Sequence, residues 1–202
     1  MEAFSKLTAV AAPLDMANVD TDKIIPGRFL RKLRGPGYDK LAFHDIRFNA
    51  DGSENPDFVL NKAPCRAAKL LVAAANFGCG SSREAAVYVL FDYGIRSVIA
   101  PSFGDIHYGN ELQNGMLPVV LPEDVCAKLR AQLRDKPGAQ ITVDLESQTV
   151  TGPDAATYRF DIDATHKERL LKGLDDIGLV MQYESRIEAF EKKHHAEFPW
   201  LA

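Results

Sequence analysis

Cysteine is scarce in this sequence, and the few cysteines present lie far apart. Cys65, Cys79 and Cys126 are the only three among 202 residues. An odd and scattered set argues against a disulfide framework and favours a reducing compartment. The three also lack the close spacing of metal or iron–sulfur cluster ligands. We therefore expect this chain to bind no metal ion and no cofactor of its own.

Long apolar runs and dense basic runs are absent as well. No stretch approaches the roughly 20 apolar residues of a membrane-spanning helix, and residues 1–12 lack the pattern of a signal peptide. The net charge is −4 with no Lys/Arg cluster, so neither nucleic acid nor membrane is an expected partner. We expect a cytoplasmic protein. Small anionic substrates stay open, because a local arginine rather than the net charge binds them.

The composition is otherwise that of a globular protein, with one unusual stretch. Hydrophobic residues make up 46% and charged residues 26%, which predicts one large packed domain, or a domain with a tail. Residues 76–84 read Asn-Phe-Gly-Cys-Gly-Ser-Ser-Arg-Glu. They lie between an apolar run at 67–75, typical of a strand buried on both faces, and a helical pattern that ends near Gly94.

A strand, a glycine-rich turn and a helix start in this order predict an anion-binding site. Gly78 and Gly80 allow positive φ and let a ligand approach the backbone. Arg83 presents a planar fork that fits a carboxylate or a phosphate. Ser81 or Ser82 could simply cap the helix, since serine is a favoured N-cap. Two serines, two glycines and an arginine together favour a functional site.

Known motifs of nucleotide-binding proteins and hydrolases do not fit this stretch. The dinucleotide pattern needs a glycine at Arg83, and a P-loop needs a lysine after its second glycine. The nucleophile elbow of hydrolases needs a closing glycine. Two alternatives stay open. One is a non-catalytic anion-binding module, and the other is a thiol enzyme that uses Cys79, since helix N-termini activate thiols.

Apolar runs and turn residues elsewhere predict an α/β fold. A short strand is expected at 8–14. Runs that alternate with helical patterns are typical of a parallel sheet, and they lie at 67–75, 96–100 and 116–121. Shorter runs predict an antiparallel group, at 141–145, 148–150 and 158–162. Capping-box patterns at Thr165 and Ser185 predict the starts of two C-terminal helices.

Two segments before the glycine-rich stretch also carry polar side chains. Residues 18–22 form an Asx-rich turn that can place carboxylates at a site, although the residues alone favour an ordinary turn or N-cap. Residues 28–35 are basic and apolar, and they predict one or two helical turns closed by Gly35. Residues 35–64 contain several aromatic anchors, so we expect an ordered excursion rather than a flexible linker.

Three motifs in one order carry a resemblance to a known family. Asp-Thr-Asp-Lys-Ile-Ile-Pro at 20–26 precedes the stretch at 76–84, and Ala-Pro-Ser-Phe-Gly-Asp-Ile follows at 100–106. Together they resemble the small subunits of 3-isopropylmalate dehydratase, a family of the aconitase superfamily, and the resemblance covers nearly the whole chain. One departure is Ala85, where many members have histidine.

The resemblance implies the swivelling β/β/α domain of that superfamily. The expected fold is therefore an α/β domain with a buried, mostly parallel sheet flanked by helices, a small antiparallel group and C-terminal helices. Residues 1–202 are expected to form this single domain with its C-terminal helical extension.

The resemblance also implies a reaction and a partner. Members interconvert 2-isopropylmalate and 3-isopropylmalate through 2-isopropylmaleate in leucine biosynthesis, by dehydration and rehydration. The expected substrate is thus a small dicarboxylate. The expected partner is a large subunit that holds a four-iron four-sulfur cluster, in a heterodimer or a higher assembly. The small subunits of homoaconitase and of citraconate-type hydratases remain close alternatives.

Roles for individual residues follow from the same resemblance. Ser81 is expected to be the catalytic base, Arg83 to hold a substrate carboxylate, and Asp22 to lie at the active site beside a histidine of the other subunit. Ser82, Gly78 and Gly80 are expected to bind substrate beside them. One further substrate-binding arginine falls at either Arg31 or Arg34, depending on which family pattern is followed.

Overall fold

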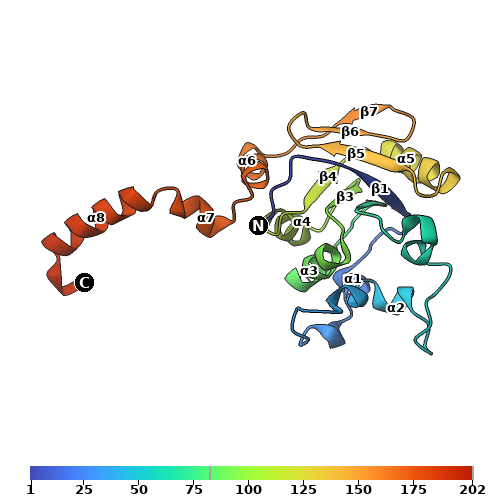
Figure 1. Ribbon diagram of the computed structural model, residues 1–202, viewed down its shortest axis with the longest axis horizontal. Coiled ribbons are helices and arrows are strands. Elements are labelled where there is room, and N and C mark those ends of the chain that lie inside the picture. The colour runs from blue at the N-terminus through green and yellow to red at the C-terminus, as the bar shows by residue number, and fades with distance from the viewer. Residues whose placement is uncertain (82, 202) are drawn as a thin grey trace.

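The structure is a computed structural model that describes residues 1–81 and 83–201. Its centre is a sheet with the strand order β4-β3-β2-β1-β5-β6-β7 (Figure 1). The strands are β1 Lys6–Leu14, β2 Leu70–Ala73, β3 Ser97–Ala100, β4 Leu117–Val120, β5 Gln140–Asp144, β6 Thr149–Thr151 and β7 Thr157–Arg159. The helices are α1 Thr21–Ile24, α2 His44–Arg47, α3 Glu84–Tyr93, α4 Asp105–Gln113, α5 Glu123–Asp135, α6 Ala164–Lys172, α7 Asp176–Met181 and α8 Glu184–Glu197.

The parallel part of the sheet is covered on both faces. Strands β1 to β4 pair in parallel, and every residue of β2 and β3 is buried. Because successive side chains of a strand point to opposite faces, Leu71 packs into the core that contains α3 while Leu70 packs into the core that contains α5. This arrangement explains why 67–75 is apolar without alternation.

Strand β1 joins the two groups of strands into one sheet. Its first five residues pair antiparallel with β5, and its last four pair in parallel with β2. The predicted antiparallel group, β5 to β7, therefore extends the parallel sheet instead of forming a separate layer. The predicted fold class, an α/β domain with a parallel sheet, a small antiparallel group and C-terminal helices, is confirmed.

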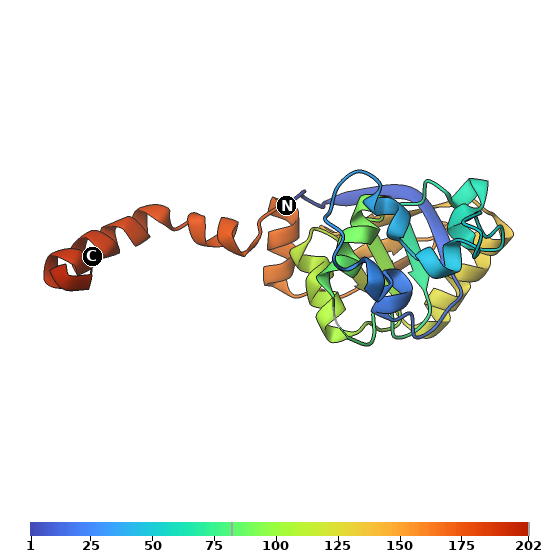
Figure 2. The same ribbon diagram turned by 90° about the horizontal axis from the view of Figure 1, so that it is seen from below.

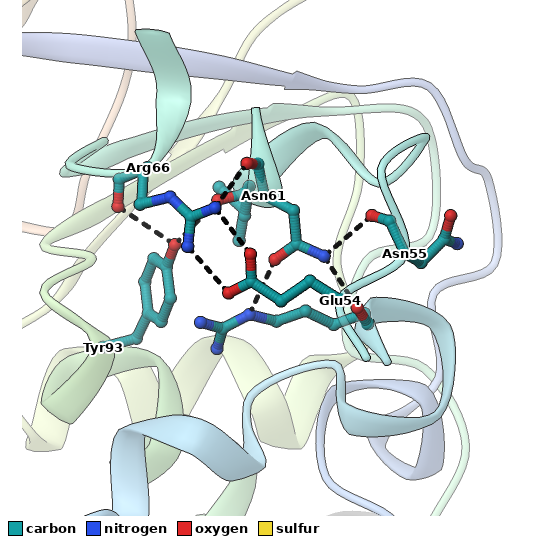
Figure 3. A network of polar contacts seen from close by, with 7 residues as sticks. Glu54, Asn55, Asn61, Arg66 and Tyr93 are labelled. Atoms are coloured by element: carbon teal, nitrogen blue, oxygen red, sulfur yellow. Dashed lines mark hydrogen bonds and ion pairs between the residues drawn. The ribbon is translucent and has the colours of Figure 1, made fainter. Parts of the chain in front are cut away.

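The long connection between β1 and β2, which includes residues 35–64, is held by a network of polar contacts (Figure 3). The guanidinium of Arg66 binds both carboxylate oxygens of Glu54, at 2.7 and 2.6 Å, and donates to the Asn61 carbonyl at 2.8 Å. The amide of Asn61 donates in turn to the carbonyls of Arg47 and Asn55. These bonds satisfy backbone groups that no sheet or helix pairs, so the expected order of this segment is confirmed.

Two predicted helix starts and one predicted helix differ from the structure. Helix α6 is capped by Asp163, whose carboxylate accepts from the N–H groups of residues 165 and 166, rather than by Thr165. Helix α8 begins at Glu184, before Ser185. Residues 28–35, predicted as one or two helical turns, form only a 3-10 turn at Gly27–Phe29. Their arginines bind neighbouring elements, Arg28 to Asp45 and Arg34 to Asp92, instead of forming a continuous helical face.

The C-terminal helices leave the body of the protein. Both views show α7 and α8 extending as an arm beyond α6, with the C-terminus near its far end (Figures 1 and 2). Neither helix has a buried residue. Within the described residues no helix is both long and apolar enough to cross a membrane.

Candidate active site

The glycine-rich turn is held between the loops that follow β1 and β3. The N–H of Gly78 donates to the carbonyl of Val19 at 2.7 Å, and the N–H of Gly104 donates to the carbonyl of Phe77 at 2.8 Å. On the β3 side, the Ser102 hydroxyl accepts from the N–H of Asn76 at 2.9 Å. Carboxyl ends of parallel strands meet at one edge of a sheet, where α/β proteins bind ligands. The carboxyl ends of β1, β2 and β3 converge on this turn.

The two glycines of the turn adopt the backbone conformation that was expected of them. Gly78 has φ 70° and Gly80 has φ 86°. At Gly78 a side chain is excluded for a second reason, because an added Cβ would lie 2.2 Å from the ring of His107. Gly78 therefore combines positive φ with direct packing of its α carbon on an imidazole.

That imidazole belongs to a buried pair on α4. The Nε2 atom of His107 lies 3.0 Å from Oε1 of Glu111, and both side chains have no solvent exposure. Burial raises the pKa of the Glu111 carboxyl, and the His107 ring beside it opposes this shift. The sequence predicted only core or surface packing for His107 and did not single out Glu111. A spacing of four residues makes two side chains neighbours on a helix, but it does not reveal that this helix face is buried.

Ser81 is exposed and does not cap the helix. Helix α3 begins at Glu84, and its N-cap position is Arg83, whose backbone is extended. The Ser81 carbonyl accepts a 2.5 Å hydrogen bond from the Thr21 hydroxyl, while its own hydroxyl has no partner among the described residues. The capping role that competed with a functional role for Ser81 is therefore wrong. Ser82 lies outside the described residues.

Arg83 and Asp22, both expected at the active site but not as partners of each other, form an ion pair in this chain. The Nη1 atom of Arg83 donates to Oδ1 of Asp22 at 2.9 Å. The arginine side chain is 25% exposed and the aspartate 59%. Gly27, which sequence reasoning missed, lets this approach occur, since an added Cβ would meet Nη1 at 3.1 Å.

The two candidate substrate-binding arginines lie in different surroundings. Arg34 binds the carboxylate of Asp92 at 2.8 and 2.5 Å and stacks over the ring of Tyr88. Asp92 is in the last turn of α3, whereas Arg83 precedes its first turn, so a helix length of about 13 Å separates them. Arg31 is exposed and forms no hydrogen bond or ion pair within residues 1–81 and 83–201.

A neighbouring ion pair fixes the start of the basic segment. Arg28 binds both oxygens of the Asp45 carboxylate, one of them at 2.7 Å. The hydrogen bonds from Arg28 hold the pKa of Asp45 down to about 2. The segment is thus tied at Arg28 and at Arg34, with the exposed Arg31 between the two ties.

The cysteines do not form a cluster site in the described part of the chain. Cys65 and Cys126 are buried, and Cys79 is half-buried in the glycine-rich turn. No group of three His, Cys, Asp or Glu side chains there could hold a metal ion. The donor set therefore does not fit an iron–sulfur cluster on this chain, which needs several thiolates around one point.

Comparison with known proteins places this chain among aconitase-type domains. Residues 1–124 match the family model of the aconitase C-terminal domain, and residues 127–164 match one described as LeuD_N. Residues 176–202 match the model of the C-terminal domain of the 3-isopropylmalate dehydratase small subunit.

Individual relatives agree with these matches over their full lengths. The 3-isopropylmalate dehydratase small subunit of Paramagnetospirillum magneticum is 52% identical over 201 residues, 100% of each chain. That of Gluconacetobacter diazotrophicus is also 52% identical, covering 99% of this chain and 97% of its own. A crystal structure of 3-isopropylmalate dehydratase (leuD) from Methanocaldococcus jannaschii matches with TM-score 0.64 and 25% identity, over 94% of this chain and 99% of that one. The chain belongs to the family of 3-isopropylmalate dehydratase small subunits.

The packing of His107 on Gly78 makes a stability prediction with a matched control. Gly78→Ala should lower the free energy of unfolding by about 2–5 kcal/mol, because it combines left-handed strain with an overlap in the core. Gly37→Ala has the same backbone problem, φ 82°, but no heavy atom within 4 Å of the added Cβ. It should cost about 1–2 kcal/mol. Urea unfolding of the two full-length variants checks this, and equal losses would mean that the His107 contact does not constrain the turn.

Proposed function

We propose that this chain forms one side of the active site of a 3-isopropylmalate dehydratase, the hydro-lyase of its family. The reaction interconverts 2-isopropylmalate and 3-isopropylmalate through 2-isopropylmaleate, a step of leucine biosynthesis. The observation that carries the proposal is the convergence of Ser81, Arg83 and Asp22 at the carboxyl edge of the sheet, in a member of this family. The partner is the large subunit that the name of the family implies.

The chemistry requires a base and a carboxylate holder on this side of the substrate. Dehydration removes a proton from the carbon next to a carboxylate and hydroxide from the adjacent carbon, which leaves an alkene and water. Rehydration in the opposite sense then completes the isomerisation. Ser81 is the proposed base, because its exposed hydroxyl is free of a helix-capping role. An unperturbed serine is too weak an acid for this task, so its alkoxide needs local stabilisation.

Three features of the site supply that stabilisation. The first N–H groups of α3 have no partner within the helix and carry the positive end of its dipole. The glycines of the turn let anionic atoms approach the backbone. Arg83 adds a full positive charge, and of its donors Asp22 engages Nη1 alone in the described chain. Preorganised donors of this kind provide much of the rate enhancement in enzymes.

Arg83 thus has donors left for a substrate carboxylate. We assign the carboxylate to its remaining N–H groups, with Gly78, Gly80 and Ser82 as further binding positions. Asp22 holds the guanidinium in place before substrate arrives. This use of one arginine fork for two acceptors follows from the fixed geometry of its five N–H donors.

Expulsion of hydroxide needs a Lewis acid. We place the four-iron four-sulfur cluster of the superfamily on the large subunit, where it would supply this function, since this chain's cysteines do not fit such a group. The three cysteines, free in the structure, agree with a reducing, cytoplasmic setting. The body is then a single swivelling domain, with α7 and α8 as its extension.

Isopropylmalate is the substrate that the relatives favour. Full-length relatives at 52% identity are named for it, whereas homoaconitate would bring a third carboxylate that requires a further cation. The same relatives argue against a non-catalytic anion-binding module and against a thiol enzyme. The Cys79 thiol, moreover, forms no hydrogen bond to a base in the described part of the chain.

Ser81→Ala in the assembled enzyme should abolish turnover. Loss of a base or of a transition-state donor costs factors of about a hundred or more. Folding and assembly should be unaffected, because the hydroxyl is exposed. Cys79→Ser is the matched control and should retain most activity. Steady-state rates with 2-isopropylmalate separate the two, and an active Ser81→Ala beside an inactive Cys79→Ser would establish the thiol mechanism instead.

The exposed Arg31 is the better candidate for the additional substrate contact, since Arg34 is engaged by Asp92. Arg31→Ala should lower kcat/KM by the equivalent of roughly 1.5–3 kcal/mol, the range for a charged hydrogen bond. Arg34→Ala should affect mainly the stability of its segment. Specificity constants for isopropylmalate and homoaconitate decide between the two residues. Near-wild-type values for both variants would remove this segment from the substrate site.

A further inference from the structure

Thr21 is a buried polar residue at the start of α1, only 1% exposed, and its hydroxyl is not needed to begin that helix. The N-cap of α1 is Asp20, whose carboxylate accepts from the N–H of Lys23 at 2.7 Å. Helix α1 is a single turn that packs beside α3 (Figure 1). The Thr21 hydroxyl is therefore available for a contact outside its own helix.

Thr21 donates two hydrogen bonds to the glycine-rich turn. Its backbone N–H donates to the carbonyl of Cys79 at 3.1 Å, and its hydroxyl donates to the carbonyl of Ser81 at 2.5 Å. The second distance is at the short end of the range for O–H···O hydrogen bonds. A parallel bridge between Asp20 and Cys79 adds to the first contact. One residue of α1 thus holds the turn at two positions.

The two bonded carbonyls lie on either side of Gly80, which has φ 86°. Glycine changes its backbone conformation at little cost, so it needs neighbours to hold it. Packing around Gly80 is loose, because an added Cβ would meet only the Cβ of Asp20, at the ordinary contact distance of 3.5 Å. The carbonyl of Cys79 belongs to the peptide unit before Gly80, and that of Ser81 to the unit after Ser81. Thr21 therefore restrains both ends of the Gly80-Ser81 segment.

We propose that Thr21 is a positioning residue for the reaction, and that its N–H and hydroxyl hold the Gly80-Ser81 segment so that the Ser81 hydroxyl keeps the orientation that proton abstraction requires. This inference rests on the proposed function, in which Ser81 is the base. Thr21 acts through the main chain of Ser81 and does not contact the substrate, because its own side chain is buried.

The next residue of α1 holds a different group of the site. Asp22 pairs with Arg83 at 2.9 Å, so adjacent residues of one helical turn hold the proposed base and the proposed carboxylate holder by separate bonds. Loss of the Thr21 hydroxyl should therefore disturb the base and leave the Arg83 contact in place. A displacement of a reacting group by about 1 Å can cost a factor of about a hundred in rate. The expected signature is a fall in kcat with little change in KM.

The test uses the full-length chain assembled with the purified large subunit of the same dehydratase. Thr21→Val removes the hydroxyl but keeps the branched shape, Thr21→Ala removes both, and Thr21→Ser keeps the hydroxyl. Ser97→Ala is the control, because the Ser97 hydroxyl is also buried and donates to a carbonyl, that of Leu117, at 2.6 Å. Ser97 begins β3 and so lies at the opposite edge of the parallel strands. The measurements are kcat and KM for 2-isopropylmalate at saturating large subunit, and the urea midpoint of unfolding of each free variant.

Thr21→Val and Thr21→Ala should each lower kcat by about tenfold or more. Their KM should stay within about twofold of wild type, because the interaction lost is one that acts in the transition state. Thr21→Ser should keep kcat within about threefold of wild type, since the hydroxyl can still hold the Ser81 carbonyl. Ser97→Ala should lower the midpoint of unfolding and leave kcat unchanged, because it removes a buried hydrogen bond away from the site.

A wild-type kcat for the two variants that lack the hydroxyl overturns the proposal. A Thr21→Ser enzyme as slow as Thr21→Val overturns it too, since the hydroxyl would then not be the group that matters. Failure of the proposed function has a different signature, because Ser81→Ala would then turn over normally. Failure of this inference alone leaves Ser81→Ala inactive and Thr21→Val at the wild-type rate.

Discussion

The position of the Gly78 backbone is the constraint on which the site depends. Its N–H is bonded to the loop after β1, and its α carbon lies against the His107 ring on α4, so neither neighbour can move without the other. These two contacts fix the position of the turn relative to the edge of the sheet. Ser81 and Arg83, three and five residues further on, are thereby presented at the surface. The glycine-rich turn is therefore held in place by its neighbours as well as by the positive φ of its glycines.

Local features of the site could be predicted from the sequence, because they depend on short-range rules. The positive φ of Gly78 and Gly80, the buried strand before them and the end of α3 at Gly94 follow from residue type and apolar periodicity. The pairing of Arg83 with Asp22 spans 61 residues, and only a family resemblance had placed both at one site. Periodicity contains no information about such long-range pairs.

Other features were missed for the same physical reason. The ion pair between Arg34 and Asp92 depends on how the segment after β1 packs against α3. No local sequence pattern predicts that packing. The His107–Glu111 pair differs from an ordinary surface pair because both side chains are completely buried. The predicted caps at Thr165 and Ser185 were wrong by one or two residues, since a stronger acceptor, Asp163, lay nearby in one case.

The two edges of the sheet carry different features. The carboxyl edge of the sheet offers an exposed serine hydroxyl, a guanidinium and the first N–H groups of α3, but the described donor set does not fit a cluster. The amino edge carries the arm formed by α7 and α8, in which no residue is buried. The carboxyl edge of the sheet is thus the end of the molecule that is suited to bind substrate.

The most direct measurement is the hydration of 2-isopropylmaleate by the purified chain, alone and with increasing amounts of the large subunit. We expect a colourless protein with no turnover by the chain alone, and activity that rises with the large subunit until the two are equimolar. Turnover by the chain alone, or a visible absorption band from iron–thiolate bonds in the isolated chain, would contradict an active site shared between two chains.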